Sequence, residues 1–162
     1  MLVVYRQHRV RGTQVCYIMC MSLMSVTGGQ VPCMCREDKT VIRVLIADDH
    51  PLLREGLKMI LSETKNIQVV DEASNGEEVL DKVKKDIFDV MVLDINMPRK
   101  GGFEVLEELK TLGNKIPVLI LSTYSEEEYK ELAMKEGAAG YLTKEQAPEK
   151  LIDAIRRIFK KG

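Results

Sequence analysis

Five short apolar runs, separated by segments with helical periodicity, constrain this chain more than any other feature. The runs lie at residues 42–47, 67–72, 90–94, 117–122 and 140–143, and most are continuously apolar rather than alternating. Continuous apolar strands are typical of parallel sheets that are covered on both faces. The sequence therefore predicts an α/β fold, a doubly wound five-stranded parallel sheet with helices on both faces.

Helix boundaries in the intervening segments are marked by turn and capping residues. Asn75 with Glu78, and Ser125 with Glu128, have the spacing of a capping box, which predicts that helices begin directly after Asn75 and Ser125. Pro148 suits the first turn of a last helix. These signals give five strand–helix units in the part of the chain that follows Val41.

Polar residues end several of the predicted strands. Asp48 and Asp49 follow the first strand, Asp94 ends the third, Ser122 ends the fourth and Lys144 follows the fifth. The carboxyl ends of parallel strands lie at one edge of a sheet, so these groups should converge. Three carboxylates require a cation such as Mg²⁺, and Lys144 would add a second positive charge. A neutralised Asp94 could then act as a nucleophile toward a phosphoryl group.

Four motifs, "ADDHP", "LDINMPRKGG", "VLILST" and "GAAGYLTKE", resemble those of the receiver domain of two-component response regulators. The resemblance covers residues 42 to about 160. It implies a flavodoxin-like fold with strand order 2-1-3-4-5, and a domain that accepts phosphate from a sensor histidine kinase rather than acting as an enzyme on other molecules.

The resemblance also implies a metal site for Mg²⁺ or Mn²⁺. Asp49 and Asp94 would be direct ligands, together with the backbone carbonyl of Asn96, and Asp48 would act through a water molecule. Asp94 would be the phosphoacceptor.

Further residues would contact the phosphoryl group or respond to it. Lys144 and Ser122 match the positions that contact it, and Tyr141 matches the aromatic switch position. Asn96 and Tyr124 match the two positions that control how long the phosphate persists.

A longer motif, "ADDHPLLREGLKMIL", resembles receivers that carry a C-terminal helix-turn-helix of the LuxR type, which implies a role in transcription regulation. The chain ends at Gly162, so we expect no effector domain in it, and its net charge of −1 predicts no direct binding to nucleic acid. Phosphorylation-promoted homodimerisation, a cytoplasmic location and no membrane segment are also expected. Glu145 stands where many receivers have proline in a cis peptide, which leaves the conformation of the Lys144–Glu145 peptide open.

Residues 1–38 differ in composition from the receiver-like region at 39–162. All four cysteines (Cys16, Cys20, Cys33 and Cys35) lie here, in an irregular spacing that is weak support for a metal site. A basic start before a short apolar stretch is loosely similar to a signal peptide. We favour instead a disordered or non-native extension, because the rest of the chain indicates a cytoplasmic protein.

Two other functions remain open from the sequence. One is a binding module with the same fold that works without phosphorylation. The other is an enzyme of the haloacid-dehalogenase type, which also uses a strand-end aspartate as phosphate acceptor, but that family needs a second aspartate two residues after the first, where Asn96 stands here.

Overall fold

The computed structural model describes residues 7–10, 13–16 and 41–160, in two compact units formed by Met1–Glu37 and Asp38–Gly162. In the first unit, strands β1 (Gln7–Val10) and β2 (Thr13–Cys16) pair in antiparallel fashion, a pairing that the sequence analysis did not predict. Cys20, Cys33 and Cys35 lie outside the described residues, as does most of the predicted extension at 1–38.

The second unit contains a five-stranded parallel sheet. Its strands are β3 (Ile42–Ala47), β4 (Ile67–Ala73), β5 (Val90–Asp94), β6 (Val118–Ser122) and β7 (Gly140–Thr143). They lie in the order β4-β3-β5-β6-β7, which is the predicted 2-1-3-4-5 order within this unit. All five predicted strands are confirmed, with boundaries within one residue.

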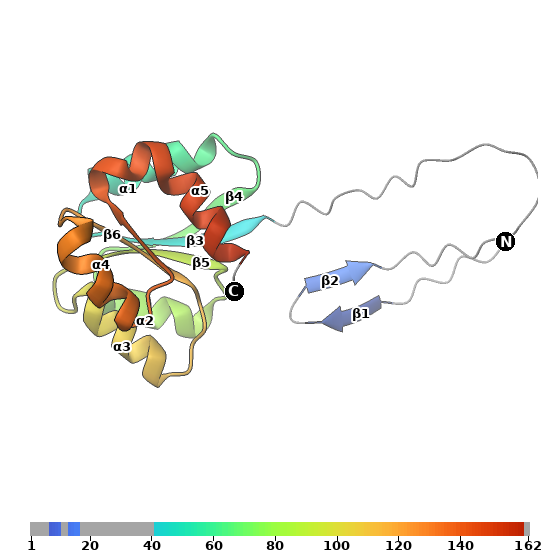
Figure 1. Ribbon diagram of the computed structural model, residues 1–162. Helices are drawn as coiled ribbons and strands as arrows, with labels where there is room; N and C mark the ends of the chain where they lie inside the picture. Colours follow the sequence, from blue (N-terminus) through green and yellow to red (C-terminus); the bar gives the residue numbers. More distant parts are fainter. Residues whose placement is uncertain (1–6, 11–12, 17–40, 161–162) are drawn as a thin grey trace, which may run out of the picture. The chain divides into compact units, whose positions relative to one another are not determined.

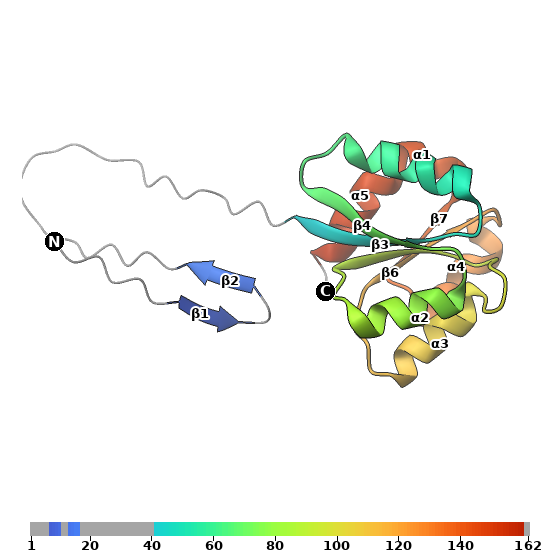
Figure 2. The ribbon, with the colours of Figure 1, turned by 180° about the vertical axis from the view of Figure 1, so that it is seen from behind.

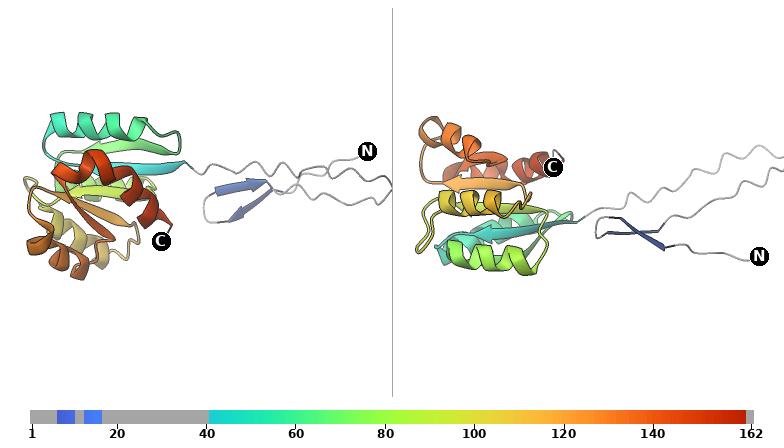
Figure 3. Two further views of the ribbon diagram at one scale, coloured as in Figure 1. Left: turned by 45° about the horizontal axis from the view of Figure 1, so that its top comes forward. Right: turned by 90° about the horizontal axis from the view of Figure 1, so that it is seen from below.

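Helices cover both faces of the sheet (Figures 1 and 2). They are α1 (Pro51–Ser62), α2 (Gly76–Lys85), α3 (Gly102–Thr111), α4 (Glu126–Lys135) and α5 (Ala147–Phe159), with a short 3₁₀ helix, η1 (Lys144–Gln146), before α5. Helices α1 and α5 lie on one face, and α2, α3 and α4 lie on the other; the right view of Figure 3, from below, looks onto the face with α2, α3 and α4. The predicted doubly wound architecture is therefore confirmed.

Two apolar clusters, one on each face, form the core. Val44 and Ile46 of β3 pack toward α1 and α5, and Leu45 and Ala47 pack toward the other three helices. Every residue of β5 and β6 is buried. Burial on both faces explains why these strands are continuously apolar in the sequence. Among the described residues, no helix is long and apolar enough to cross a membrane.

Strand β4 contains a bulge that the sequence does not reveal. Val44 pairs with Val69, but the next residue, Leu45, pairs with Asp71, so Val70 is an extra residue in β4. Side chains alternate between the faces of a strand, and an extra residue reverses that alternation. Glu72 therefore lies on the face of the sheet that α1 covers, where it contacts Arg54 of α1.

The predicted helix caps are confirmed at one helix and wrong at another. The Asn75 side chain accepts a hydrogen bond from the backbone N–H of Glu78 at 3.0 Å, as predicted for α2. Within residues 41–160, the Ser125 side chain makes no capping hydrogen bond at the start of α4. At α3, where no cap was predicted, the Glu104 carboxylate accepts from the backbone N–H of Gly101. In the described residues, Lys144–Glu145 included, every peptide bond is trans.

Candidate functional site

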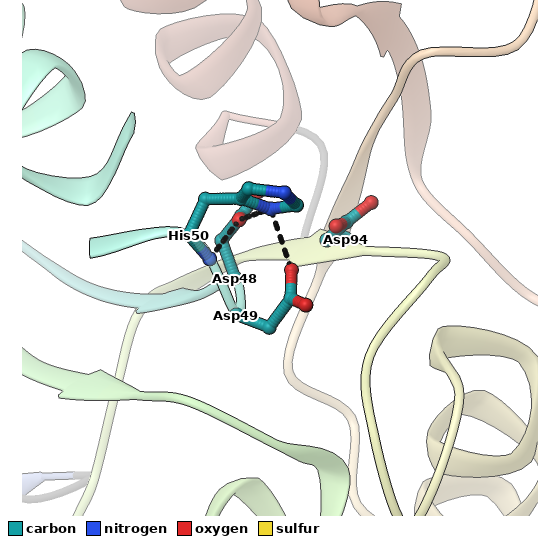
Figure 4. Close-up of side chains that lie close together, drawn as sticks. All are labelled: Asp48, Asp49, His50 and Asp94. Carbon is teal, nitrogen blue, oxygen red and sulfur yellow. Dashed lines mark hydrogen bonds and ion pairs between the residues drawn. The ribbon is translucent and has the colours of Figure 1, made fainter. Parts of the chain in front are cut away.

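The carboxyl ends of β3 and β5 bring three carboxylates together at one edge of the sheet (Figure 4). Asp48 and Asp49 follow β3, and Asp94 is the last residue of β5. Potential ligand atoms of these three residues and of His50 all lie within 4.8 Å of one another. The side chains of Asp48 and Asp94 are almost completely buried, at 1% and 2% exposure. The predicted convergence is therefore observed.

Lys144 is the positive group that lies against the buried carboxylates. Its Nζ is 2.8 Å from Asp94 Oδ2 and 2.7 Å from Asp48 Oδ2. Lys144 begins η1, directly after β7, so the fifth strand delivers this charge to the same edge as the aspartates. One ammonium group thus bridges carboxylates from two different strands, at the position that the sequence predicted.

Burial and charge perturb both partners of this contact. Burial, the largest influence, raises the pKa of Asp94, and the charge of Asp48 adds to it, against the hydrogen bond from Lys144, which lowers it. For Lys144, burial acts to lower the pKa, but the contacts of the ammonium group with the Asp48 and Asp94 carboxylates outweigh burial and raise the pKa. The surroundings of Asp94 therefore disfavour its charged form relative to an aspartate in water.

The donor set fits a hard divalent cation. Within residues 41–160, Oδ2 of Asp48 and Oδ1 of Asp49 are buried atoms that receive no well-directed hydrogen bond. Lys144 Nζ lies near the first atom and His50 Nδ1 near the second. Carboxylate oxygens with free lone pairs are the ligands that Mg²⁺ prefers. Asn96, whose carbonyl was predicted as a ligand, lies at the same edge and donates its backbone N–H to Asp94 Oδ1 at 3.3 Å.

His50 is a member of this cluster to which the sequence analysis assigned no role. Its Nδ1 lies 2.6 Å from Asp49 Oδ1 and 3.1 Å from Asp48 Oδ1, and its backbone N–H donates to Asp48 Oδ1 at 2.8 Å. Figure 4 shows the imidazole lying against the two carboxylates. Its position directly after the acidic pair was the only available signal in the sequence.

Ser122, Tyr141 and Tyr124 form a second hydrogen-bonded group near the ends of β6 and β7. The buried Ser122 hydroxyl accepts from the backbone N–H of Tyr124 at 3.1 Å. The buried Tyr141 hydroxyl donates to the backbone carbonyl of Tyr124 at 3.0 Å. Burial raises the pKa of Tyr141. The Tyr124 ring stacks on Tyr129 of α4, with ring centroids 4.5 Å apart. The loop after β6 is therefore tied to both strands.

The close approach of α3 to the end of β5 requires a glycine. A β-carbon at Gly102 would overlap the backbone carbonyl oxygen of Asp94. Gly102 also donates its N–H to the carbonyl of Ile95 at 2.8 Å. The first turn of α3 is thus packed directly against the backbone that carries Asp94.

Comparison with known proteins places this arrangement in a family. Residues 44–156 match the family described as the response regulator receiver domain. The chain belongs to this family. Its members are signalling proteins of two-component systems rather than classical enzymes, and they bind Mg²⁺ at an acidic pocket, which corresponds here to the cluster of Asp48, Asp49 and Asp94.

Several bacterial regulatory proteins are similar to this receiver domain in sequence. The nitrate/nitrite response regulator protein NarL of Escherichia coli K12 is 40% identical over 116 residues, covering 70% of this chain and 53% of its own length. The regulator YxjL of Bacillus subtilis is 38% identical over 119 residues, and the response regulator UvrY of E. coli K12 is 36% identical; both cover 74% of this chain and 55% of their own length. The chain therefore spans about half the length of these relatives.

Solved structures of receiver domains are similar in fold. The signal receiver domain of the NarL response regulator from Mycobacterium tuberculosis is 33% identical with a TM-score of 0.71, covering 75% of this chain and 98% of the other. The response regulator ChrA of a heme-sensing two-component system is 40% identical with a TM-score of 0.63, covering 75% of this chain and 58% of its own. Together these matches identify a receiver of the LuxR/NarL type.

Proposed function

We propose that this receiver is a switch in which Asp94 accepts a phosphoryl group from a phosphohistidine of a sensor histidine kinase. The observation that supports this most is the buried Asp94 carboxylate, held by Lys144 and faced by the acidic pair at the edge of the sheet. An Asp94 oxygen attacks the phosphorus, the phosphorus–nitrogen bond breaks, and the histidine imidazole leaves with the electron pair. Such an attack requires that the negative charge of Asp94 and of the transferring oxygens be neutralised.

The metal is assigned to this chain's own oxygen ligands. Asp49, Asp94 and the backbone carbonyl of Asn96 would bind Mg²⁺ or Mn²⁺ directly, and Asp48 would act through water. When bound, the cation supplies positive charge to the carboxylates and to the phosphoryl oxygens. Lys144, already 2.8 Å from Asp94 Oδ2, holds the acceptor and then contacts the phosphoryl group.

The switch is assigned to Ser122 and Tyr141. The Ser122 hydroxyl accepts a hydrogen bond from Tyr124 and carries a proton that it would donate to a phosphoryl oxygen on Asp94. Movement of Ser122 toward that oxygen would displace Tyr124 and with it the hydrogen bond from the Tyr141 hydroxyl. Phosphorylation would thereby shift the population of the β6–α4 loop and the α4–β7–α5 surface.

The biological setting follows from the relatives. We assign residues 39–162 to the receiver and residues 1–38 to an extension outside it, and we place the protein in the cytoplasm with a sensor histidine kinase as its partner. The relatives named above include a transcriptional regulatory protein, YxjL, so the output that we propose is transcription regulation, with homodimerisation on phosphorylation.

Intact-mass spectrometry with acetyl phosphate tests the assignment. The protein should gain the mass of one phosphoryl group in the presence of Mg²⁺, and chelation should prevent this. Asp94→Asn should abolish the gain, whereas Asp153→Asn, which changes an exposed aspartate of α5, should leave it intact. A gain that survives Asp94→Asn would refute the acceptor, and an unmodified protein under all conditions would favour a binding module that works without phosphorylation.

A further inference from the structure

We infer that Arg54 is a positioning residue for the metal site, because it fixes the backbone that carries the acidic pair. This inference rests on the proposed function, since it concerns how Asp48 and Asp49 are presented to the cation. Arg54 lies in the first turn of α1 and carries no ligand atom itself.

The guanidinium of Arg54 links three elements at the edge of the sheet. Its Nη1 donates to the backbone carbonyl of Asp48 at 2.6 Å, and its Nε donates to Glu72 Oε2 at 3.1 Å. The side chain is only 16% exposed. A partly buried arginine with two charge-assisted hydrogen bonds is held in one orientation far more firmly than a solvated one.

The β4 bulge is what makes this contact possible. If the side chains of β4 alternated regularly, Glu72 would lie on the same face as Val70, which packs against the opposite cluster of the core. The bulge turns Glu72 toward α1, where its second oxygen also accepts from Lys58 at 2.7 Å. Glu72 thus holds Arg54 in place while Arg54 reaches Asp48.

The bonded carbonyl belongs to the peptide unit that joins Asp48 to Asp49. The N–H of Asp48 donates to the carbonyl of Ala73 at 3.1 Å, so the Asp48 backbone is fixed on the sheet side by β4 and on the helix side by Arg54. A rotation of the Asp48–Asp49 peptide would turn the Asp49 side chain away from Asp94. Groups that orient metal ligands in this way commonly change metal affinity by about 10–100-fold when they are removed.

Magnesium affinity and amide exchange, measured on the whole chain, test this role. Arg54→Gln should weaken Mg²⁺ binding about tenfold or more by calorimetric titration. Arg54→Lys keeps the positive charge but lacks the planar guanidinium, so its affinity for Mg²⁺ should lie between that of the parent and that of Arg54→Gln. Lys58→Gln is the matched control. Lys58 donates to the same Glu72 but does not reach Asp48, and its substitution removes the same positive charge from α1. It should bind Mg²⁺ like the parent.

Hydrogen exchange without metal separates this inference from the proposed function. In Arg54→Gln the amides of Asp49 and His50 should exchange faster than in the parent, while the amide of Leu45 in the buried β3 strand should not change. If the parent binds no Mg²⁺, the proposed function fails, and the exchange rates still test Arg54. Parent-like exchange at Asp49 and His50 in Arg54→Gln, or an equal loss of Mg²⁺ affinity in Lys58→Gln, would overturn the positioning role.

Discussion

At the scale of single residues, the site combines one buried ammonium group with more negative charge than it neutralises. Lys144 contacts both Asp48 and Asp94, while Asp49 completes the acidic cluster beside them. Like charges held close together at low exposure raise the free energy of the folded state. The metal-free protein is therefore destabilised by the same carboxylates that prepare it to bind a cation.

Replacing Asp94, the proposed acceptor, should stabilise the metal-free protein at neutral pH. Burial and the charge of Asp48 raise the pKa of Asp94 in the folded protein, so the protonated carboxyl stabilises the fold and the ionised one does not. This contribution to the free energy of unfolding is complete below the ordinary aspartate pKa of about 3.9 and is lost as the pH rises through the pKa of the folded state. Asp94→Asn carries no charge, so without Mg²⁺ at pH 7 it should melt about 4 °C higher or more, a shift that corresponds to about 1 kcal/mol.

Calorimetric melting at several pH values checks this sign. The difference in melting temperature between Asp94→Asn and the parent should shrink as the pH falls toward 3. Asp153→Asn should show no comparable rise in melting temperature at pH 7. A lower melting temperature for Asp94→Asn at pH 7 would mean that the ion pair with Lys144 outweighs the cost of burying the charge.

Tyr124 should prolong the life of the phosphorylated form. Loss of the acyl phosphate requires a water in line with the bond to Asp94, and Tyr124 is bulky and a poor base at neutral pH. We expect a phosphoprotein that lasts minutes or more. Tyr124→Ala should lose phosphate several times faster, and Tyr124→Phe, which keeps the ring stacked on Tyr129, should resemble the parent. Equal lifetimes for Tyr124→Ala and the parent would show that the ring is no shield.

At the scale of elements, similar sequence signals at two helix starts have different structural outcomes. Asn75 is completely buried, its side-chain Oδ1 accepts from the backbone N–H of Glu78, and its Nδ2 donates to the Glu78 carboxylate at 2.7 Å. Ser125 begins α4 without a capping contact. A cap stabilises a helix only when the side chain reaches the free backbone N–H groups of the first turn.

The two caps should therefore differ in their contribution to stability. Asn75→Ala should lower the free energy of unfolding by about 1–2 kcal/mol, because it removes a cap and leaves buried polar groups unpaired. Ser125→Ala should change it by less than about 0.5 kcal/mol. Urea denaturation of both variants measures this difference, and equal losses would show that Ser125 caps α4 in solution.

At the scale of the whole molecule, exposed apolar side chains mark two surfaces for self-association. On α1, Leu52 and Met59 are 86% and 72% exposed, and on α4, Leu132 and Met134 are exposed. Exposed apolar residues that share a helix face, as Leu52 and Met59 do at a spacing of seven residues, are typical of interaction surfaces. Homodimerisation through one of these helices would convert the local change at Asp94 into a change of assembly.

Sedimentation with and without beryllofluoride tests this expectation. With Mg²⁺ present, beryllofluoride should shift the protein from monomer toward dimer, and Met59→Glu or Leu132→Glu should block the shift according to which helix forms the interface. Ile87→Glu is the control, because Ile87 is also exposed but lies just before the amino end of β5, away from α1 and α4; it should leave the shift unchanged. An unchanged sedimentation coefficient in the parent would refute phosphorylation-promoted dimerisation.

The sequence by itself determined the strands, the helices and the convergence of Asp48, Asp49, Asp94 and Lys144. These follow from the sequence because apolar periodicity reports burial locally, and because the carboxyl ends of parallel strands meet at one edge whatever the side chains between them. The family resemblance supplied the strand order and the roles of individual residues. Identification of a receiver domain required nothing from the tertiary structure.

Only the tertiary structure decided how the acidic pair is held. The bulge at Val70 and the contact of Arg54 with the Asp48 carbonyl have no local signature in the sequence. The contacts of the His50 imidazole had only the position of His50 after the acidic pair as a signal. The sequence likewise does not reveal that the Ser125 side chain makes no capping hydrogen bond within residues 41–160, because the spacing of Ser125 and Glu128 matches that of a capping box. Each of these depends on hydrogen-bond geometry set by strand register or loop conformation, which residue spacing along the chain does not specify.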